Sequence, residues 1–130
     1  MVDWKAARER TESQIAQYNI VGTPDTAVEL LSGGNQQRAL LALLPEALNV
    51  LLLEHPTRGL DVSSSQWVWA KLLARREQGT MLLFTSTDLD ELVQYSDRIV
   101  VFSGGRVSAP VEADTVTVRE LGYLIGGRGL

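Results

Sequence analysis

The chain has 130 residues and a formal net charge of −4, from 12 basic and 16 acidic side chains. This acidic balance argues against nucleic acid as the main partner, because nucleic-acid-binding domains usually carry a basic patch. Cysteine is absent and there is one histidine, which excludes a disulfide framework, a cysteine metal site and a multi-histidine zinc site. The length and a hydrophobic fraction of 45% fit one globular domain or a large part of one.

Neither a targeting segment nor a membrane span is predicted. Met1 is followed within a few residues by the charged side chains of Asp3 and Lys5, so a signal peptide is not indicated. The longest apolar region, residues 39–53, is interrupted by Pro45 and by polar residues. It is shorter than the roughly 20 apolar residues that cross a bilayer. We therefore expect a soluble, cytoplasmic protein that is at most peripheral to a membrane.

Hydrophobic periodicity and capping residues predict helices that alternate with strands. The expected helices cover residues 2–18, 36–44, 63–78, 88–95 and 117–125, and the expected strands cover 50–54, 81–85 and 98–102, with a short antiparallel strand at Val107. Residues 126–130 are expected to fray. Strands separated by helices are typical of an α/β fold with a parallel sheet flanked by helices. The apolar run at 50–54 suits a strand that is buried on both faces of such a sheet.

The expected helix over 63–78 carries two pairs of notable side chains. Trp67 and Trp69 are two positions apart and cannot share a helix face, so one is expected in the core. The other is expected to be exposed or to contact a partner. Arg75 and Arg76 are expected on a solvated face of the same helix.

The segment LSGGNQQR at residues 31–38 predicts a phosphate-binding turn that opens a helix. Ser32 is a good N-cap, whose hydroxyl can accept from a backbone N–H two or three residues later. Gly33 and Gly34 lack a Cβ, so a large anion can approach the backbone. The helix that follows directs its positive end and its free N–H groups at that anion. A plain capped helix after a glycine turn is the alternative for this segment alone.

This turn resembles the signature loop, usually LSGGQ, of ABC-type ATPases. Residues 56–61, PTRGLD, resemble the D-loop region of that family, and residues 84–92 resemble its switch-loop region. The combination is similar to the second ATP-binding domain of bacterial sugar and nucleoside importers, over residues 4–107. In the family the D-loop crosses the dimer interface, which gives Asp61 a functional role. Asp61 can equally cap the next helix, and the two roles are compatible.

The resemblance implies a partial P-loop NTPase domain of the ABC type. The Walker A pattern G-x-x-x-x-G-K-[ST] does not occur, and no Gly-Lys pair is found anywhere in the chain. We therefore interpret residues 1–130 as the C-terminal part of one ABC ATP-binding domain that lacks the Walker A strand. Residues 1–44 would form the helical and signature region, and residues 45–130 a partial α/β core with a C-terminal hairpin and helix. A sheet left uncovered in this way predicts marginal stability or self-association.

Three positions depart from the family pattern around the nucleotide. Glu54 stands where the Walker B aspartate holds Mg²⁺, and its longer side chain makes it a weak magnesium ligand. His55 stands at the position of the catalytic glutamate, either as a base or as a decayed position without a catalytic role. Thr87 replaces the switch histidine that contacts the γ-phosphate. The site of this half is therefore expected to be degenerate.

The signature core keeps the family pattern, and this asymmetry suggests a function. The resemblance implies that a signature turn contacts ATP held by a partner domain, here through Ser32, Gly33, Gly34, Asn35 and Gln36. The expected assembly is a bacterial importer for simple sugars or nucleosides that uses ATP and Mg²⁺. Its other parts would be a second ABC ATP-binding domain and transmembrane permease subunits, at the inner face of the cell membrane.

Two other functions were weighed. One is a non-catalytic regulatory or interaction module derived from an ABC ATPase. The other is an ABC-type ATPase that acts on DNA or ribosomes, which the acidic charge disfavours. We expect the chain by itself not to hydrolyse ATP and to bind no nucleotide tightly.

Overall fold

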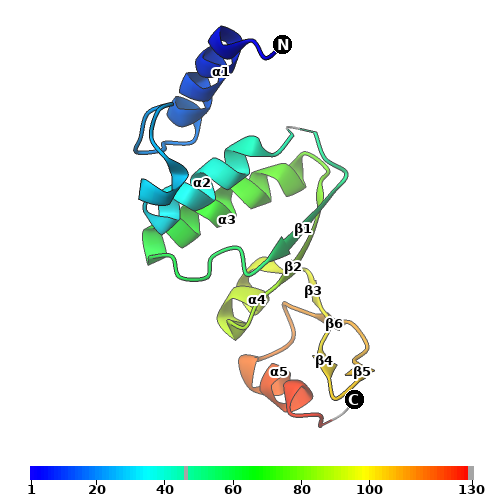
Figure 1. Cartoon of the computed structure of the whole chain (residues 1–130). Helices are drawn as coiled ribbons and strands as arrows, with labels where there is room; N and C mark the ends of the chain where they lie inside the picture. The colour runs from blue at the N-terminus through cyan, green and yellow to red at the C-terminus, as the bar shows by residue number, and fades with distance from the viewer. Residues whose placement is uncertain (46, 129–130) are drawn as a thin grey trace. The chain divides into compact units, whose positions relative to one another are not determined.

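The computed structural model describes residues 1–45 and 47–128 (Figure 1). In this part of the chain the helices are α1 (Trp4–Gln17), α2 (Gly33–Leu43), α3 (Val62–Glu77), α4 (Leu89–Tyr95) and α5 (Val118–Ile125), with a 3-10 turn, η1 (Val28–Leu30). The strands are β1 (Val50–Glu54), β2 (Met81–Thr85), β3 (Arg98–Ile99), β4 (Phe102–Ser103), β5 (Arg106–Val107) and β6 (Val111–Glu112). The chain is therefore α/β, as the sequence predicted.

The chain divides into two compact units, which are described separately. The first unit covers Met1–Leu83 and the second begins at Phe84. This division separates the parts of the chain that pack mainly within themselves. The predicted division after residue 44 instead separates a helical region from an α/β core, and it stays a prediction.

β1 and β2 form a two-stranded sheet, and α3 connects them. Met81 N donates to Asn49 O at 2.9 Å, which joins the beginnings of the two strands, so they run in the same direction. The prediction of a third strand over 98–102 in this sheet was wrong. Those residues contribute to β3 and β4, which pair antiparallel with β6 and β5 respectively. The reason is local, because Gly104 and Gly105 take φ angles of 55° and 75° and turn the chain back at once.

Helix starts follow the side chains that cap them. The N-caps of α1 to α5 are Asp3, Ser32, Asp61, Asp88 and Thr117, and each side chain accepts a backbone N–H of the first turn. At the start of α5, Thr117 and Glu120 form a capping box, in which each side chain bonds to the backbone N–H of the other residue. α2 begins at Gly33 rather than Gln36, because the helix starts directly after its serine cap.

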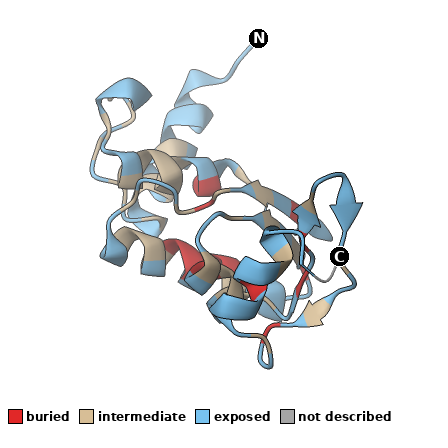
Figure 2. Cartoon of the chain, turned by 90° about the horizontal axis from the view of Figure 1, so that it is seen from below, coloured by how far each residue is buried: buried red, intermediate tan, exposed pale blue. Residues whose placement is uncertain are grey.

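The core of the first unit lies where α2 and α3 pack against each other, with buried residues drawn red in Figure 2. It contains Leu41, Ala42, Leu51, Val68, Trp69 and Leu72. Trp69 is 1% exposed whereas Trp67 is half-buried, which confirms that one of the two tryptophans belongs to the core. The prediction of a solvated face was wrong for Arg75. It is buried, and its Nη1 donates to Pro45 O at 2.7 Å, which satisfies part of the guanidinium inside the unit.

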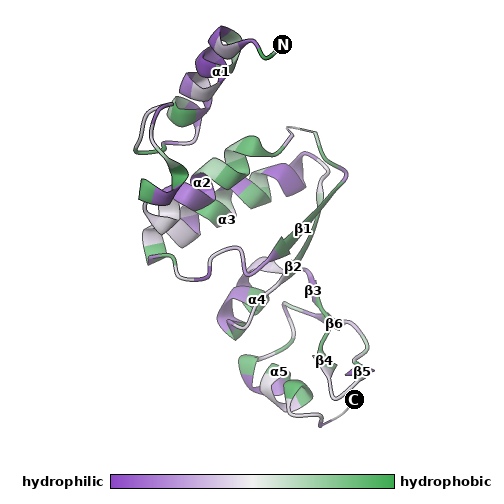
Figure 3. Ribbon diagram, in the orientation of Figure 1, coloured by the Kyte–Doolittle hydropathy of each residue, from purple (hydrophilic) through white to green (hydrophobic). Residues whose placement is uncertain are grey.

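The two strands of the parallel pair expose one apolar face. Val50 and Leu52 of β1 are 44% and 73% exposed, and Met81 and Leu83 of β2 are 53% and 50% exposed. The residues between them are buried or half-buried, apart from the exposed strand ends, and Figure 3 shows β1 in the green of hydrophobic side chains. Burial on both faces was therefore a wrong prediction, since within the described residues this face stays open.

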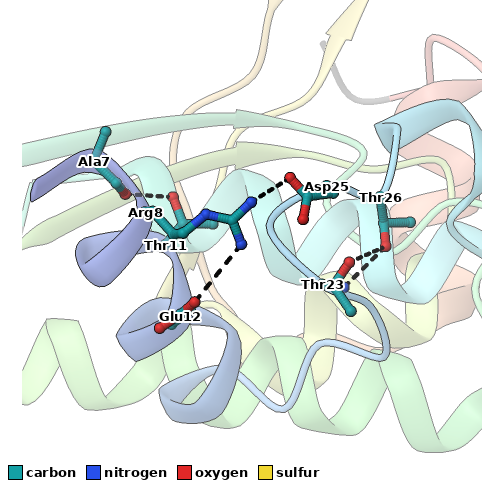
Figure 4. A network of polar contacts seen from close by, with 7 residues as sticks. All are labelled: Ala7, Arg8, Thr11, Glu12, Thr23, Asp25 and Thr26. Atoms are coloured by element: carbon teal, nitrogen blue, oxygen red, sulfur yellow. Dashed lines mark hydrogen bonds and ion pairs between the residues drawn. The ribbon is translucent and has the colours of Figure 1, made fainter. Parts of the chain in front are cut away.

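α1 is joined to the segment after it by polar contacts at the surface. The Arg8 guanidinium donates to the Asp25 carboxylate and lies 3.9 Å from a Glu12 carboxylate oxygen (Figure 4). Thr23 N donates to Thr26 Oγ1 at 2.9 Å in the same segment. The hydrogen bond and charge of Arg8 lower the pKa of Asp25. The predicted helix therefore forms, although none of its residues is buried.

The second unit has a core of its own. Ile99, Val101, Ala113 and Leu121 are buried together, and α4 packs against α5. Ser103 Oγ donates to Ile125 O at 2.7 Å, which ties the hairpin to the end of α5. Residues 126–128 form a turn, and residues 129 and 130 of the predicted frayed tail lie outside the described residues. None of the described helices has the length and apolar character that a membrane span requires.

Candidate nucleotide-contact site

The turn that opens α2 presents hydrogen-bond donors at its surface. Ser32 Oγ accepts from Asn35 N at 3.4 Å and from Asn35 Nδ2 at 2.9 Å, and Ser32 O accepts from Gln36 N at 2.9 Å. The N–H groups of Gly33 and Gly34 belong to the first helical turn, where an α-helix supplies no backbone acceptor. The predicted capping role of Ser32 is confirmed. The turn has the donors and the dipole direction that suit an anion.

Two amide side chains tie this turn to neighbouring loops. Asn35 Oδ1 accepts from Val21 N at 2.8 Å. Gln36 Nε2 donates to Val28 O at 3.2 Å and to Leu31 O at 3.1 Å. The sequence analysis assigned Asn35 and Gln36 to contact with ATP and did not predict their hydrogen bonds to the loops. Those bonds go to backbone atoms of Val21 and Val28, whose side chains give no indication of them.

The two glycines of the turn have different surroundings. A Cβ on Gly34 would lie 2.7 Å from Ser64 Oγ of α3, whereas a Cβ on Gly33 would meet only Leu60 Cδ2, at 3.9 Å. Ser64 Oγ is itself held, because it donates to Asp61 Oδ2 at 2.7 Å. Close packing of α2 on α3 therefore requires the glycine at position 34, independently of any anion.

Asp61 is the centre of a serine cluster at the start of α3. Its carboxylate accepts from Ser64 N at 3.0 Å and from Ser63 Oγ at 2.7 Å, in addition to Ser64 Oγ. The Ser64 N–H, followed by the two hydroxyls, holds the pKa of Asp61 far below its ordinary value. The carboxylate therefore stays charged as the cap of α3, and its predicted role across a dimer interface stays a prediction.

The end of β1 offers little support for catalysis. Glu54 is exposed, and His55 is half-buried in the left-handed region with φ 47°. Neither side chain makes a hydrogen bond to any part of the chain that the structure describes. Three or more metal-ligating side chains do not cluster anywhere in residues 1–45 or 47–128. Glu54 could hold Mg²⁺ only as a single carboxylate, with phosphate oxygens and waters as the other ligands.

Thr87 belongs to the second unit, between β2 and α4. It is exposed, and its neighbours form the cap of α4. Ser86 Oγ accepts from Asp88 N at 3.0 Å, and Asp88 Oδ1 accepts from Asp90 N at 3.0 Å. The structure brings Ser32, Gly33, Gly34, Asn35 and Gln36 together in one turn, and places Glu54, His55 and Asp61 elsewhere in the first unit. The predicted catalytic roles remain predictions.

A cation–aromatic cluster fixes α2 beside this turn. Arg38 Cζ lies 4.1 Å from the centre of the Trp67 ring, and its Nη1 donates to Tyr18 O at 3.3 Å. The Tyr18 and Trp67 rings meet edge to face at 6.2 Å, and Lys71 Nζ lies 5.5 Å from the Trp67 ring. These contacts explain why Trp67 is half-buried. In the sequence, the only signal for this cluster was the planar guanidinium of Arg38, which can stack on an aromatic ring.

Comparisons with known proteins place this geometry in a family context. No protein-family model matches the chain. It is 39% identical to the guanosine import ATP-binding protein NupO of Bacillus subtilis over 122 residues. The matched region covers 92% of this chain and 24% of that protein. It is 32% identical to the nucleoside import ATP-binding protein NupA of Lactococcus lactis, over 97% of this chain and 25% of that protein. The ribose import ATP-binding protein RbsA of Bacillus subtilis is 33% identical, over 98% and 27% of the respective chains.

Solved structures agree on the fold. An ATP-binding subunit of an ABC transporter matches with a TM-score of 0.73 at 16% identity, over 96% of this chain and 56% of that chain. A dimeric ATP-binding cassette bound to ADP and Pi matches with a TM-score of 0.67 at 20% identity, over 89% and 51%. The chain spans about a quarter of the length of the curated relatives that it matches. Over that length, it is homologous to the ATP-binding subunits of ABC-type sugar and nucleoside importers.

Proposed function

We propose that this chain is part of the ATP-binding subunit of a bacterial ABC importer for a simple sugar or a nucleoside, and that its signature turn contacts ATP held by a partner domain. One observation carries the proposal. The turn of Ser32 combines a matching motif, a fixed serine hydroxyl and first-turn N–H groups for which the helix supplies no acceptor, in a chain whose relatives are import ATP-binding proteins.

The chemistry at the turn is recognition of negative charge. The hydroxyl of Ser32 and the N–H groups of Gly33 and Gly34 would donate to the γ-phosphate, and the positive end of α2 adds to the attraction. ATP supplies the anion and the energy of hydrolysis. One helix N-terminus contributes only on the order of 1–2 kcal/mol. The turn therefore needs a partner domain that holds the rest of the nucleotide.

The nucleotide site of this half is proposed to be degenerate. Glu54 is a single exposed carboxylate, and His55 has a side chain without hydrogen bonds in the described part of the chain. Thr87 carries no positive charge. Magnesium would therefore be bound weakly at this site. The ATP and Mg²⁺ that drive transport would be bound by the full assembly and not tightly by this chain alone.

The proposed assembly also contains a second ABC ATP-binding domain and transmembrane permease subunits. The chain would then lie in the cytoplasm against the inner face of the cell membrane. The acidic charge of the chain fits a role without nucleic acid. The open apolar face of β1 and β2 also favours self-association when the chain is produced alone.

The test compares Ser32→Ala with His55→Ala in the assembled importer, by ATP hydrolysis and by transport. Loss of a hydrogen bond to a charged group costs about 1.5–3 kcal/mol, so Ser32→Ala should slow the importer roughly tenfold to hundredfold. His55→Ala should have little effect. A more damaging His55→Ala would show that this half carries its own catalytic chemistry. Equal activity of all three proteins would favour a non-catalytic module. The purified chain alone should release no phosphate from Mg-ATP.

A further inference from the structure

We propose that Asn35 is a positioning residue that sets the direction of the Ser32 hydroxyl, so that its proton points away from α2 and toward an incoming phosphate. This inference rests on the proposed function of the signature turn and adds a second residue to it. Asn35 would act through Ser32 rather than on the nucleotide itself.

The first step concerns the orientation of the Asn35 amide. Val21 N–H can only donate, and it lies 2.8 Å from one end of the Asn35 side chain. That end must therefore be the oxygen, Oδ1. The nitrogen Nδ2 is then the atom that faces Ser32 Oγ, at 2.9 Å. The contact with Val21 thus fixes Asn35 as a donor toward the serine.

The second step concerns the hydroxyl. Ser32 Oγ accepts from Asn35 Nδ2 at 2.9 Å and from Asn35 N at 3.4 Å. A hydroxyl has two acceptor positions and one proton, so these two contacts engage its acceptor side. Asn35 offers no acceptor at this point that could attract the proton. The O–H of Ser32 is therefore left to donate to a group outside the turn.

The third step is the anchor of Val21. The segment that carries it follows α1, and Arg38 Nη1 donates to Tyr18 O at 3.3 Å just before it. Ile20 N donates to Ile15 O at 3.0 Å, which continues the tie to α1. Val21 is thus presented to Asn35 by a segment that is held at two points. The alignment of the hydroxyl does not depend on a bound ligand.

The variant Asn35→Asp tests this chain of contacts with almost no change of shape. Its carboxylate still accepts from Val21 N, but an acceptor oxygen replaces Nδ2, so the Ser32 proton turns inward to donate to it. In the assembled importer, Asn35→Asp should weaken ATP-driven association with the partner domain as much as Ser32→Ala does, roughly tenfold to hundredfold. The double variant should lose nothing further, since both changes remove the same hydroxyl donor. Affinity for ADP, which has no γ-phosphate, should stay the same.

Gln37→Glu is the matched control for charge. It adds a carboxylate two positions after Asn35, where the side chain makes no hydrogen bond to Ser32 within the described residues, and should have a much smaller effect. Equal damage from Gln37→Glu and Asn35→Asp would overturn the inference, as would additive losses in the double variant. A damaging Ser32→Ala beside a harmless Asn35→Asp would overturn the inference and leave the proposed function standing. A harmless Ser32→Ala would overturn both.

A second measurement on the chain itself needs no nucleotide. The Val21 amide proton should exchange slowly with solvent in the native chain and in Asn35→Asp, and faster in Asn35→Ala, which lacks the acceptor. Unchanged exchange in Asn35→Ala would contradict the first step, since the Val21 contact would then not exist in solution. Equal thermal unfolding of native chain and Asn35→Asp would exclude a merely structural effect, and a large loss of stability would overturn the positioning role.

Discussion

The turn at Ser32 is held by side-chain hydrogen bonds, whereas the end of β1 is shaped by its backbone alone. Ser32, Asn35 and Gln36 all bond to neighbouring groups, and Gly34 lies directly against α3. At the end of β1 the side chains of Glu54 and His55 make no hydrogen bonds within the described residues, and the chain turns through a left-handed His55. The positions that match the family motif are thus the ones with structural support. The positions that depart from it could change without disturbing their neighbours.

Among these substitutions, Gly34→Ala should lower the free energy of unfolding most, because it disturbs the packing of the turn at Ser32. Its Cβ would lie 2.7 Å from Ser64 Oγ, which Asp61 holds in place, so α2 must move away from α3. Overpacking of this kind costs about 1–3 kcal/mol of unfolding free energy. Gly33→Ala is the matched control, because it meets only an ordinary contact and a helix favours alanine over glycine by about 0.5–1 kcal/mol. Denaturant unfolding of the two variants measures the difference, and equal destabilisation would contradict the packing role of Gly34.

His55→Gly should raise the free energy of unfolding, by less than Gly34→Ala lowers it. A non-glycine residue in the left-handed region costs roughly 1–2 kcal/mol, and glycine removes this cost. Glycine also loses more chain entropy on folding, which offsets part of the gain. We therefore expect a gain of about 1 kcal/mol in the free energy of unfolding. His55→Ala should show no such gain because it keeps the Cβ. A loss of stability in His55→Gly would show that the imidazole supports the end of β1 and would remove the contrast with the turn at Ser32.

Asp61→Asn should produce the smallest change, and one that depends on pH. Asparagine is as good an N-cap as aspartate, so the variants should differ little in fold. The native carboxylate has a folded pKa below its unfolded value, so its contribution is fully present above the ordinary aspartate pKa. It is lost as the pH falls below that value toward the folded pKa. The stability difference between native chain and Asp61→Asn should therefore shrink below the ordinary aspartate range, and a constant difference from neutral to acidic pH would contradict it.

Local sequence signals predicted most helices and their caps. The features that were not predicted depend on contacts between residues far apart in the sequence. The caps at Ser32 and at Thr117 with Glu120 could be predicted because donor and acceptor lie within one turn of chain. The burial of Arg75 could not, because its acceptor, Pro45 O, lies 30 positions away. The same holds for the Val21 contact of Asn35, across 14 positions. An uncovered sheet was expected, but which face of β1 stays open could not be predicted, because an apolar run predicts a strand without telling which of its faces is covered.

The absence of a side chain at Gly34 also has a mechanical consequence. The backbone of α2 rests on Ser64 with no flexible atoms between them, and Ser64 is bonded to the carboxylate of Asp61. This direct contact couples the turn at Ser32 to the start of α3, so we expect the signature segment and the PTRGLD segment to shift together rather than independently.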